Sequence, residues 1–284
     1  MPPPRHEADR RRGFSLVELL VVIAIIVVII ALIIVSVGNF QTSARLTQCM
    51  SNQHQLQLGL VSWSQDNKGK FMSPNSQYNN SSSSGMSPGG RGLYWVKSYN
   101  QEREPGDPLR LEGSGSGDNI PETVYALRDG ALWDYIGDEK AYRSPLDKTG
   151  RVRSYALNGF ISDLPDNPQS NPTTSWGPTV DRISKVRNPS NTFYTIPEED
   201  PGHAYNRGGW VIDLNTIGGV RWKDVPAIWT EDGRYALSFI DGSSRIVQSA
   251  NPELADILTT NEMPVTEETR DDFEQLSEWL DPTR

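Results

Sequence analysis

Residues 10–35 read RRRGFSLVELLVVIAIIVVIIALIIV, and this stretch predicts a helix that crosses a membrane. From Leu19 to Val35 the chain holds 17 consecutive Leu, Val, Ile or Ala residues. At about 1.5 Å per residue the run spans roughly 25 Å, and its flanks extend it toward a bilayer core of about 30 Å. Three arginines precede the run, so the positive-inside rule predicts a cytoplasmic N terminus.

Glu18 interrupts the apolar character of this stretch. A carboxylate at the centre of a membrane helix costs about 2.5–3.5 kcal/mol, which makes such a residue a functional candidate. A plain single-pass anchor explains the length and the arginines, and it leaves Glu18 unexplained. A secretory signal peptide predicts a shorter apolar region of about 7–15 residues, followed by a cleavage site for which residues 36–38 are only a fair match.

The stretch RRGFSLVELL, residues 11–20, resembles the prepilin signature of type IV pilins and type II secretion pseudopilins. The resemblance implies that a membrane peptidase cuts after Gly13 and methylates the new N-terminal residue, Phe14. Glu18 then becomes the fifth residue of the mature chain. The cut creates an amine that is cationic at neutral pH. Pairing of this amine with Glu18, on the same or a neighbouring chain, would fix the axial register of packed helices.

The predicted leader also bears on the charge and the location of the protein. Residues 1–13 hold four arginines and two acidic residues, so their removal changes the formal net charge from -9 to -11. An acidic chain of this kind predicts no nucleic-acid partner. The resemblance implies single-pass insertion in the cytoplasmic (inner) membrane with an extracytoplasmic head, and a periplasmic or cell-surface filament after assembly. It implies as partners prepilin peptidase, other pilin or pseudopilin subunits, an inner-membrane assembly platform and membrane lipid.

Beyond the apolar run, the sequence predicts that the helix continues into a folded head. Residues at steps of three or four form one helical face, which ends near Asp66. They are Leu46, Cys49, Gln53, Leu56, Leu60 and Trp63. The predicted domains are a leader at 1–13, a transmembrane and assembly helix at 14–38, an amphipathic helix at 39–66, and a head at 67–284 with mobile loops at 73–92 and 101–119.

The head alternates short strand patterns with helix patterns. The predicted strands are 153–158, 191–196 (ended by Pro197) and the arms of a hairpin over 235–247 that turns at Asp241-Gly242. The predicted short helices are 122–136, 252–258 and 267–280. Strands that follow a long helix indicate an α+β fold. The predicted architecture is pilin-like, with a long N-terminal helix packed on a small antiparallel sheet.

Two positions of the head depart from the pattern of the pseudopilin-like family. The resemblance extends to short motifs in the head, and the family's C-terminal signature is a histidine, nine residues and then Asp-Gly. Glu231 stands at the histidine position before Asp241-Gly242, and Ser144 stands where a cysteine is usual. Both departures weaken any inference of a disulfide or of a histidine-dependent role.

The sequence offers little for catalysis or metal binding. Cys49 is the sole cysteine, which excludes an intrachain disulfide, and the three histidines are scattered. We predict no catalytic residue, no metal site and no cofactor, and we expect the acidic residues 198–200 to form a solvated loop rather than a calcium site. The tryptophans that could line a sugar-binding surface, and that we expect to pack in the head, are Trp176, Trp210, Trp222 and Trp229.

Two functions are compatible with these features. The first is a pilin-like structural subunit that prepilin peptidase processes and that assembles into a pilus or a type II secretion pseudopilus. The alternative is a permanently anchored extracytoplasmic module that binds a sugar or another envelope ligand and does not polymerise. The mature N terminus distinguishes them, because only the first function predicts that the chain begins at Phe14.

Overall fold

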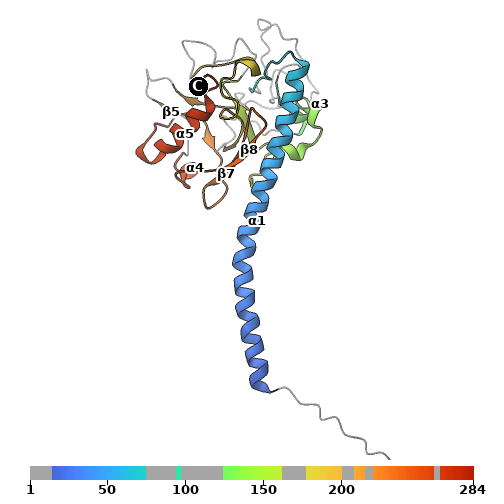
Figure 1. The fold of residues 1–284 in the computed structure, drawn as a ribbon, viewed down its shortest axis with the longest axis vertical. Helices are drawn as coiled ribbons and strands as arrows, with labels where there is room; N and C mark the ends of the chain where they lie inside the picture. The colour runs from blue at the N-terminus through green and yellow to red at the C-terminus, as the bar shows by residue number, and fades with distance from the viewer. Residues whose placement is uncertain are drawn as a thin grey trace, which may run out of the picture. The chain divides into compact units, whose positions relative to one another are not determined.

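The computed structural model describes residues 15–74, 94–96, 124–161, 177–199, 208–214, 220–258 and 263–284. The chain divides into two compact units, Met1–Ala44 and Arg45–Arg284. Helix α1, Leu16–Asp66, begins in the first unit and ends in the second (Figure 1). The predicted features that lie outside the described residues are the leader, its cleavage residues Gly13 and Phe14, the loop at 101–119 and most of the loop at 73–92.

The described part of the first unit is the N-terminal part of α1, and its apolar side chains are exposed. Between Leu16 and Leu32, the exposed fraction of the large apolar side chains runs from 44% at Val22 to 80% at Leu16. Glu18 is the one charged residue of this segment. Such a helix needs an apolar environment or neighbouring helices to cover it. Among the described residues, no helix combines the length and the apolarity that a membrane span requires.

In the second unit, α1 buries one face against the head. The face predicted from the sequence is confirmed, because each of its residues is at most 4% exposed. They are Leu46, Cys49, Gln53, Leu56, Leu60 and Trp63. Their spacing of three or four residues therefore reflects burial of one helix face in the core of the head.

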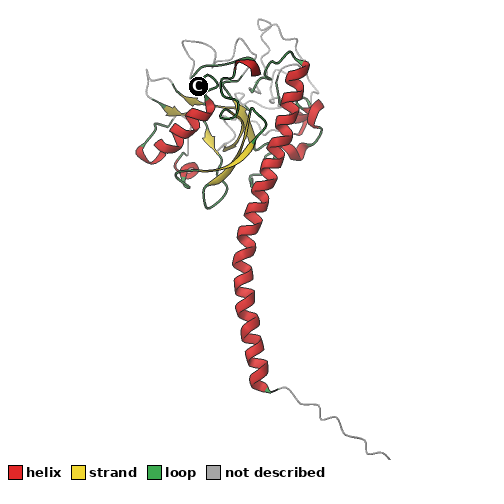
Figure 2. Cartoon of the chain, viewed as in Figure 1, coloured by secondary structure: helices red, strands yellow, loops and turns green. Residues whose placement is uncertain are grey.

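The head is built on a sheet, whose strands are yellow in Figure 2. The strand order is β3-β1-β2-β7-β8. Its strands are β1 (Tyr155–Asn158), β2 (Phe193–Glu199), β3 (Gly209–Trp210), β7 (Arg234–Phe239) and β8 (Ser244–Gln248), and β6 (Val225–Pro226) pairs with β2. A separate pair consists of β4 (Ile212–Asp213) and β5 (Arg221–Trp222). Among the described strands, only β1 and β3 pair in parallel.

The expectation of an antiparallel sheet is therefore wrong at one edge. β2 runs antiparallel to β1, and the chain then reverses and adds β3 on the other side of β1. A strand placed there after one reversal runs in the same direction as β1, with Leu157 opposite Gly209. The result is a mixed sheet, and strand patterns alone do not reveal on which side of β1 the chain returns.

The predicted hairpin is confirmed. β7 and β8 pair in continuous antiparallel register, from Arg234 opposite Gln248 to Ser238 opposite Ser244. Gly242 in the turn has a φ of 101°, a conformation that favours glycine. The Asp-Gly dipeptide therefore stands where the turn requires it.

β2 extends beyond its predicted end at Pro197 and continues to Glu199. The Pro197 carbonyl accepts the Ala227 N–H with an N–O distance of 2.9 Å. The next residue, Glu198, donates its N–H to the Ser154 carbonyl at 3.0 Å. Proline lacks only the N–H donor, so a position that uses its carbonyl leaves the strand intact.

The sheet lies between the head-side part of α1 and two C-terminal helices, α4 (Leu254–Ile257) and α5 (Arg270–Leu280). The core on the α1 side includes Leu56, Leu60, Trp63, Tyr155, Leu157 and Tyr194. The core on the other side includes Phe193, Ile196, Leu237, Phe239, Leu254, Phe273, Leu276 and Leu280. Both faces of the sheet are thus apolar, which explains why β1 is buried throughout and β7 is buried at every position after Arg234.

A bulge in β2 turns two successive side chains toward α1. The register of β2 with β7 shifts between Phe193 and Thr195. Tyr194 packs in the core beside α1, and Thr195 Oγ1 donates to Gln53 Oε1 with an O–O distance of 2.7 Å. Neighbouring side chains of a regular strand point to opposite faces, so the bulge accounts for this exception.

The single helix predicted at 122–136 is wrong, because the structure has two short helices, α2 (Val124–Arg128) and α3 (Trp133–Ile136). Gly130 lies between them, and a Cβ atom there would stand 2.3 Å from the Trp95 carbonyl oxygen. This close backbone contact requires a glycine and interrupts the helix. Short 3₁₀ turns also occur at Glu139–Tyr142, Ile183–Lys185 and Glu267–Thr269.

Gly59 allows α1 and α3 to approach closely, and its substitution tests this packing. A Cβ atom at Gly59 would lie 2.5 Å from Ile136 Cδ1. We expect Gly59→Ala to lower the free energy of unfolding of the head by about 1–3 kcal/mol, although alanine favours a helix. Urea denaturation of the full chain in detergent measures the change. Ser51→Ala, at an exposed position of the same helix, serves as the control, and a fully stable Gly59→Ala chain would contradict the prediction.

Candidate functional site

The described part of the N-terminal signature is the first turn of α1. The Ser15 N–H donates to Glu18 Oε2 with an N–O distance of 2.8 Å. The Val17 N–H donates to Ser15 Oγ at 3.3 Å. The first N–H groups of a helix have no partner within the helix, and here two side chains supply acceptors reciprocally. This arrangement is a variant of the capping box, in which the serine hydroxyl accepts the N–H of the second rather than the third helical residue.

The capping box gives Glu18 a role that its charge alone does not indicate. The sequence signal for this cap is Ser-x-x-Glu at residues 15–18. The charge of Glu18 in an apolar run does not by itself indicate this cap. The carboxylate also lies at the helix end where the macrodipole favours negative charge. Gly13 and Phe14 lie outside the described residues, so their roles in cleavage and methylation stay predictions.

Ser144, the position at which a cysteine is usual, faces the sole cysteine of the chain. Both side chains are buried, and Ser144 Oγ lies 2.9 Å from Cys49 Sγ. Burial raises the pKa of the Cys49 thiol, and the hydrogen bond with Ser144 only partly offsets this effect. The sulfur therefore stays protonated at neutral pH and packs as a small side chain, as expected for a core cysteine.

Glu231, which stands where the pseudopilin-like pattern would have a histidine, is exposed in the turn that precedes β7. It lines an open groove of about 680 Å³ together with Trp229, whose Nε1 donates to Glu199 Oε2 at 3.1 Å. The other lining residues are Ile228, Thr230, Asn251, Pro252, Glu253 and Asp256. The Asp-Gly half of the signature follows β7 and shapes the hairpin turn, so the two halves lie at opposite ends of one strand.

Two of the four tryptophans are core residues. Trp210 and Trp222 are fully buried in the cluster that α5 covers. Trp222 meets Phe273 of α5 edge to face, with ring centroids 5.2 Å apart. The expectation of packing is confirmed for these two residues, whereas Trp176 lies outside the described residues.

The acidic residues 198 and 199 belong to β2, so the expectation of a solvated loop is wrong for them. Glu198 is 2% exposed, and its Oε2 lies 4.0 Å from Nη1 of the fully buried Arg153. A buried carboxylate requires such a cationic neighbour. In the part of the chain that the structure describes, no three His, Cys, Asp or Glu side chains gather as possible metal ligands.

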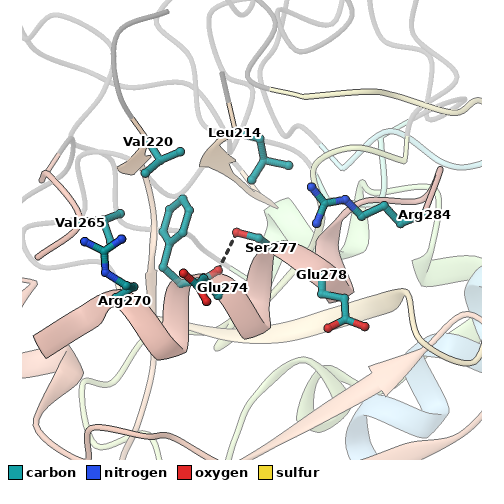
Figure 3. A pocket seen from close by; sticks show the side chains of 9 residues that line it. Leu214, Val220, Val265, Arg270, Glu274, Ser277, Glu278 and Arg284 are labelled. Carbon is teal, nitrogen blue, oxygen red and sulfur yellow. Dashed lines mark hydrogen bonds between the residues drawn. The ribbon is translucent and has the colours of Figure 1, made fainter. Parts of the chain in front are cut away.

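A second open groove follows α5 (Figure 3). Its apolar lining consists of Leu214, Val220, Val265 and Phe273, and its polar lining of Arg270, Glu274, Ser277, Glu278 and Arg284. The Ser277 hydroxyl donates to the Phe273 carbonyl within α5, with an O–O distance of 2.6 Å. Arg284 pairs with Asp281, so this cation is already neutralised. Charges of both signs around an apolar floor select no single class of ligand.

A buried ionic network holds the segment before β1. Asp147 Oδ2 accepts the Ser154 hydroxyl at 2.6 Å, and its Oδ1 accepts the Thr149 N–H at 2.8 Å. Arg151 Nη2 lies 3.4 Å from Asp147 Oδ2. Burial alone would raise the pKa of Asp147, but the hydrogen bonds from Ser154 and Thr149 and the charge of Arg151 together lower this pKa.

Substitution of Asp147 should change how stability depends on pH. The lowered pKa means that the carboxylate stabilises the fold above its ordinary pKa of 3.8, and that this contribution is lost as the pH falls through the folded-state value. We expect Asp147→Asn to lower the free energy of unfolding by about 1–3 kcal/mol at pH 7 and to flatten its acid dependence. Urea denaturation at several pH values tests this, with the exposed Asp256→Asn as control. A variant that loses stability in acid as steeply as the parent would contradict the prediction.

Introducing a cysteine opposite Cys49 tests the contact with Ser144. Because the two side-chain atoms lie 2.9 Å apart, we expect Ser144→Cys to form a disulfide with Cys49 on oxidation. The bond should raise the free energy of unfolding by about 2–4 kcal/mol relative to the reduced variant. Thiol titration and urea denaturation measure both effects, and Ser144→Ala should keep one free thiol. Two titratable thiols in the oxidised, folded Ser144→Cys chain would refute the expectation.

The prokaryotic N-terminal methylation motif matches residues 9–37 of the chain. The match includes the arginines, the Gly13-Phe14 junction, Glu18 and the apolar run. No curated protein and no solved structure matches the chain. The motif points to a structural subunit rather than to an enzyme, and it implies a membrane-anchored protein that prepilin peptidase processes. At its N terminus, the chain therefore carries the signature of type IV pilins and pseudopilins.

Proposed function

We propose that this chain is a pilin-like structural subunit, cut by prepilin peptidase between Gly13 and Phe14 and assembled into a pilus or a type II secretion pseudopilus. The observation that carries the proposal is the methylation motif at residues 9–37, which includes the exposed apolar part of α1. The motif is a processing signal. The helix supplies a surface that lipid or other apolar helices can cover.

Before assembly, the apolar segment resides in the cytoplasmic membrane. Its large side chains between Leu16 and Leu32 are at least 44% exposed, and lipid covers such a surface. The arginines at 10–12 keep the N terminus in the cytoplasm, which places the head outside it. The proposed divisions are a leader at 1–13, a membrane and assembly helix at 14–38, its amphipathic continuation at 39–66 and an extracytoplasmic head at 67–284.

Assembly replaces lipid by neighbouring helices. Removal of the leader gives Phe14 an amine, whose positive charge pairs with the Glu18 carboxylate of the same or an adjacent subunit. A paired charge is tolerated in a low dielectric where an isolated charge is not, so pairing selects one axial register. Contacts between two different surfaces of each subunit do not close into a ring, and they generate a helical filament. An inner-membrane assembly platform and other pilin subunits are the partners of this step.

The mature N terminus tests the proposal directly. We expect mass spectrometry of the membrane and filament fractions to give N-methylated Phe14 as the dominant first residue. Cells without the peptidase should retain residues 1–13 and provide the control. A dominant intact leader in peptidase-containing cells would overturn the proposal and support the permanently anchored binding module.

Removal of the Glu18 carboxylate tests the pairing. We expect Glu18→Ala to reduce the subunit recovered in sheared filaments by at least about tenfold, because the Phe14 amine then lacks its partner in an apolar bundle. Immunoblotting of sheared and membrane fractions measures the ratio. Glu7→Ala is the matched control, since this acidic residue leaves with the leader. Parent-like assembly of Glu18→Ala would show that the pairing is not required.

A further inference from the structure

We infer that the head carries two complementary charged surfaces, through which one copy of this chain docks on the next copy. The inference rests on the proposed function, because the contact forms between subunits of one filament. The first surface, called the basic surface, lies where α1 ends. The second, called the acidic groove, contains Trp229 and lies near the other end of the head-side part of α1.

The basic surface consists of four side chains that backbone contacts bring together: Lys68, Lys70, Arg182 and Lys185. Lys70 forms an antiparallel bridge with Arg182, whose Nη1 donates to the Lys68 carbonyl at 2.7 Å. Lys185 ends the 3₁₀ turn that follows Arg182. Asp181 Oδ1 lies 2.5 Å from Lys185 Nζ, and its Oδ2 lies 3.7 Å from Arg182 Nε. One carboxylate thus offsets only one of the four positive charges.

Lys68 occupies a backbone conformation that favours glycine. Its φ is 60°, in the left-handed region, and the residue is exposed. A residue with a Cβ atom is strained there, and the bond from Arg182 to its carbonyl holds the turn in place. None of the ion pairs among the described residues includes Lys68, so its ammonium group is available to a partner.

The acidic groove has a volume of about 680 Å³ and presents three exposed carboxylates, those of Glu231, Glu253 and Asp256. No lysine or arginine lines it, and the ion pairs within the described ranges include none of these carboxylates. The bond from Trp229 Nε1 to Glu199 fixes the indole ring in the groove wall. Because the face of an indole attracts cations, the groove suits lysine and arginine side chains.

The two surfaces lie at opposite ends of the head-side part of α1. Trp229 packs beside Leu46, whereas Lys68 follows Asp66, the last residue of the helix. The 20 helical steps between Leu46 and Asp66 span about 30 Å at about 1.5 Å per step. Figure 1 shows the end of α1 and helix α4, which borders the groove, at opposite edges of the head. One head cannot join surfaces so far apart, so the contact requires a second copy.

A head-to-tail contact of this kind suits a filament. It joins two different surfaces, so each copy leaves one surface open for the next copy and all heads keep the same orientation. Single exposed ion pairs contribute little to stability, but several complementary charges favour the correct partner and fix its register. The apolar helices therefore stabilise the filament, and the charged surfaces select how successive heads meet.

Carbodiimide cross-linking of sheared parent filaments tests the contact without any substitution. This reagent joins a carboxylate to an amine with no spacer. We expect amide links between Lys68 or Lys185 and Glu253 or Asp256, identified by peptide mass spectrometry. Such a link must join two copies, because the two sets lie about 30 Å apart in one head. The yield of links should fall at least about threefold in about 0.5 M NaCl, because salt screens exposed charges.

Charge reversal in the full chain tests whether the two surfaces need each other. We expect Lys68→Glu with Lys185→Glu to reduce the subunit recovered in sheared filaments about fivefold, because like charges then meet. Glu253→Lys with Asp256→Lys should have the same effect. The chain with all four substitutions again has opposite charges on the two surfaces, and its recovery should return to within about twofold of the parent.

A matched control reverses two exposed charges outside both surfaces, as Lys140→Glu with Lys148→Glu. We expect this chain to assemble like the parent, and an equal loss of filaments would overturn the inference. A parent chain that keeps its leader would overturn the proposed function together with this inference. If the parent is cleaved and assembled, the inference alone fails when its filaments give no link between the two surfaces. It also fails when the chain with four substitutions assembles as poorly as the chains with two.

Discussion

The head depends on hydrogen bonds that amide side chains of α1 make with the sheet. Gln53 Nε2 donates to the Ala236 carbonyl at 2.7 Å, and Gln57 Nε2 donates to the Phe239 carbonyl at 2.6 Å. Both side chains are at most 1% exposed, and buried amides require partners. Both acceptor carbonyls belong to β7, where carbonyl groups recur at fixed spacing. The two bonds therefore fix the position of this part of α1 along its axis and its rotation about that axis. The apolar residues between them then have one way to pack.

A comparable polar contact holds the opposite layer. Asp272 of α5 is 1% exposed, and its carboxylate accepts the Ser249 hydroxyl and the N–H groups of Ala250 and Asn251 at 2.8–2.9 Å. These bonds tie α5 to the segment that follows β8. Helices therefore cover both faces of the sheet. Buried polar side chains orient these helices, and apolar side chains stabilise their packing.

Local periodicity predicted the elements whose pattern arises within one segment. The buried face of α1 and the β7–β8 hairpin are of this kind, since spacing and a turn dipeptide determine them. Non-local contacts decided the rest: Gly130 breaks a helix because Trp95 passes close by, and β3 joins the sheet on a side that no local signal specifies. In the candidate site, Glu18 stands out by its charge, whereas Ser15 is recognised only when the spacing between the two residues is considered.

The contact between Cys49 and Ser144 frees the head from any need for oxidation. A hydroxyl opposite the thiol joins segments 95 residues apart with a hydrogen bond where two cysteines would require an oxidant. Many exported domains of modest size depend on an oxidising compartment for their covalent links. This head holds the two segments together without a covalent link, so the contact forms without an oxidising compartment.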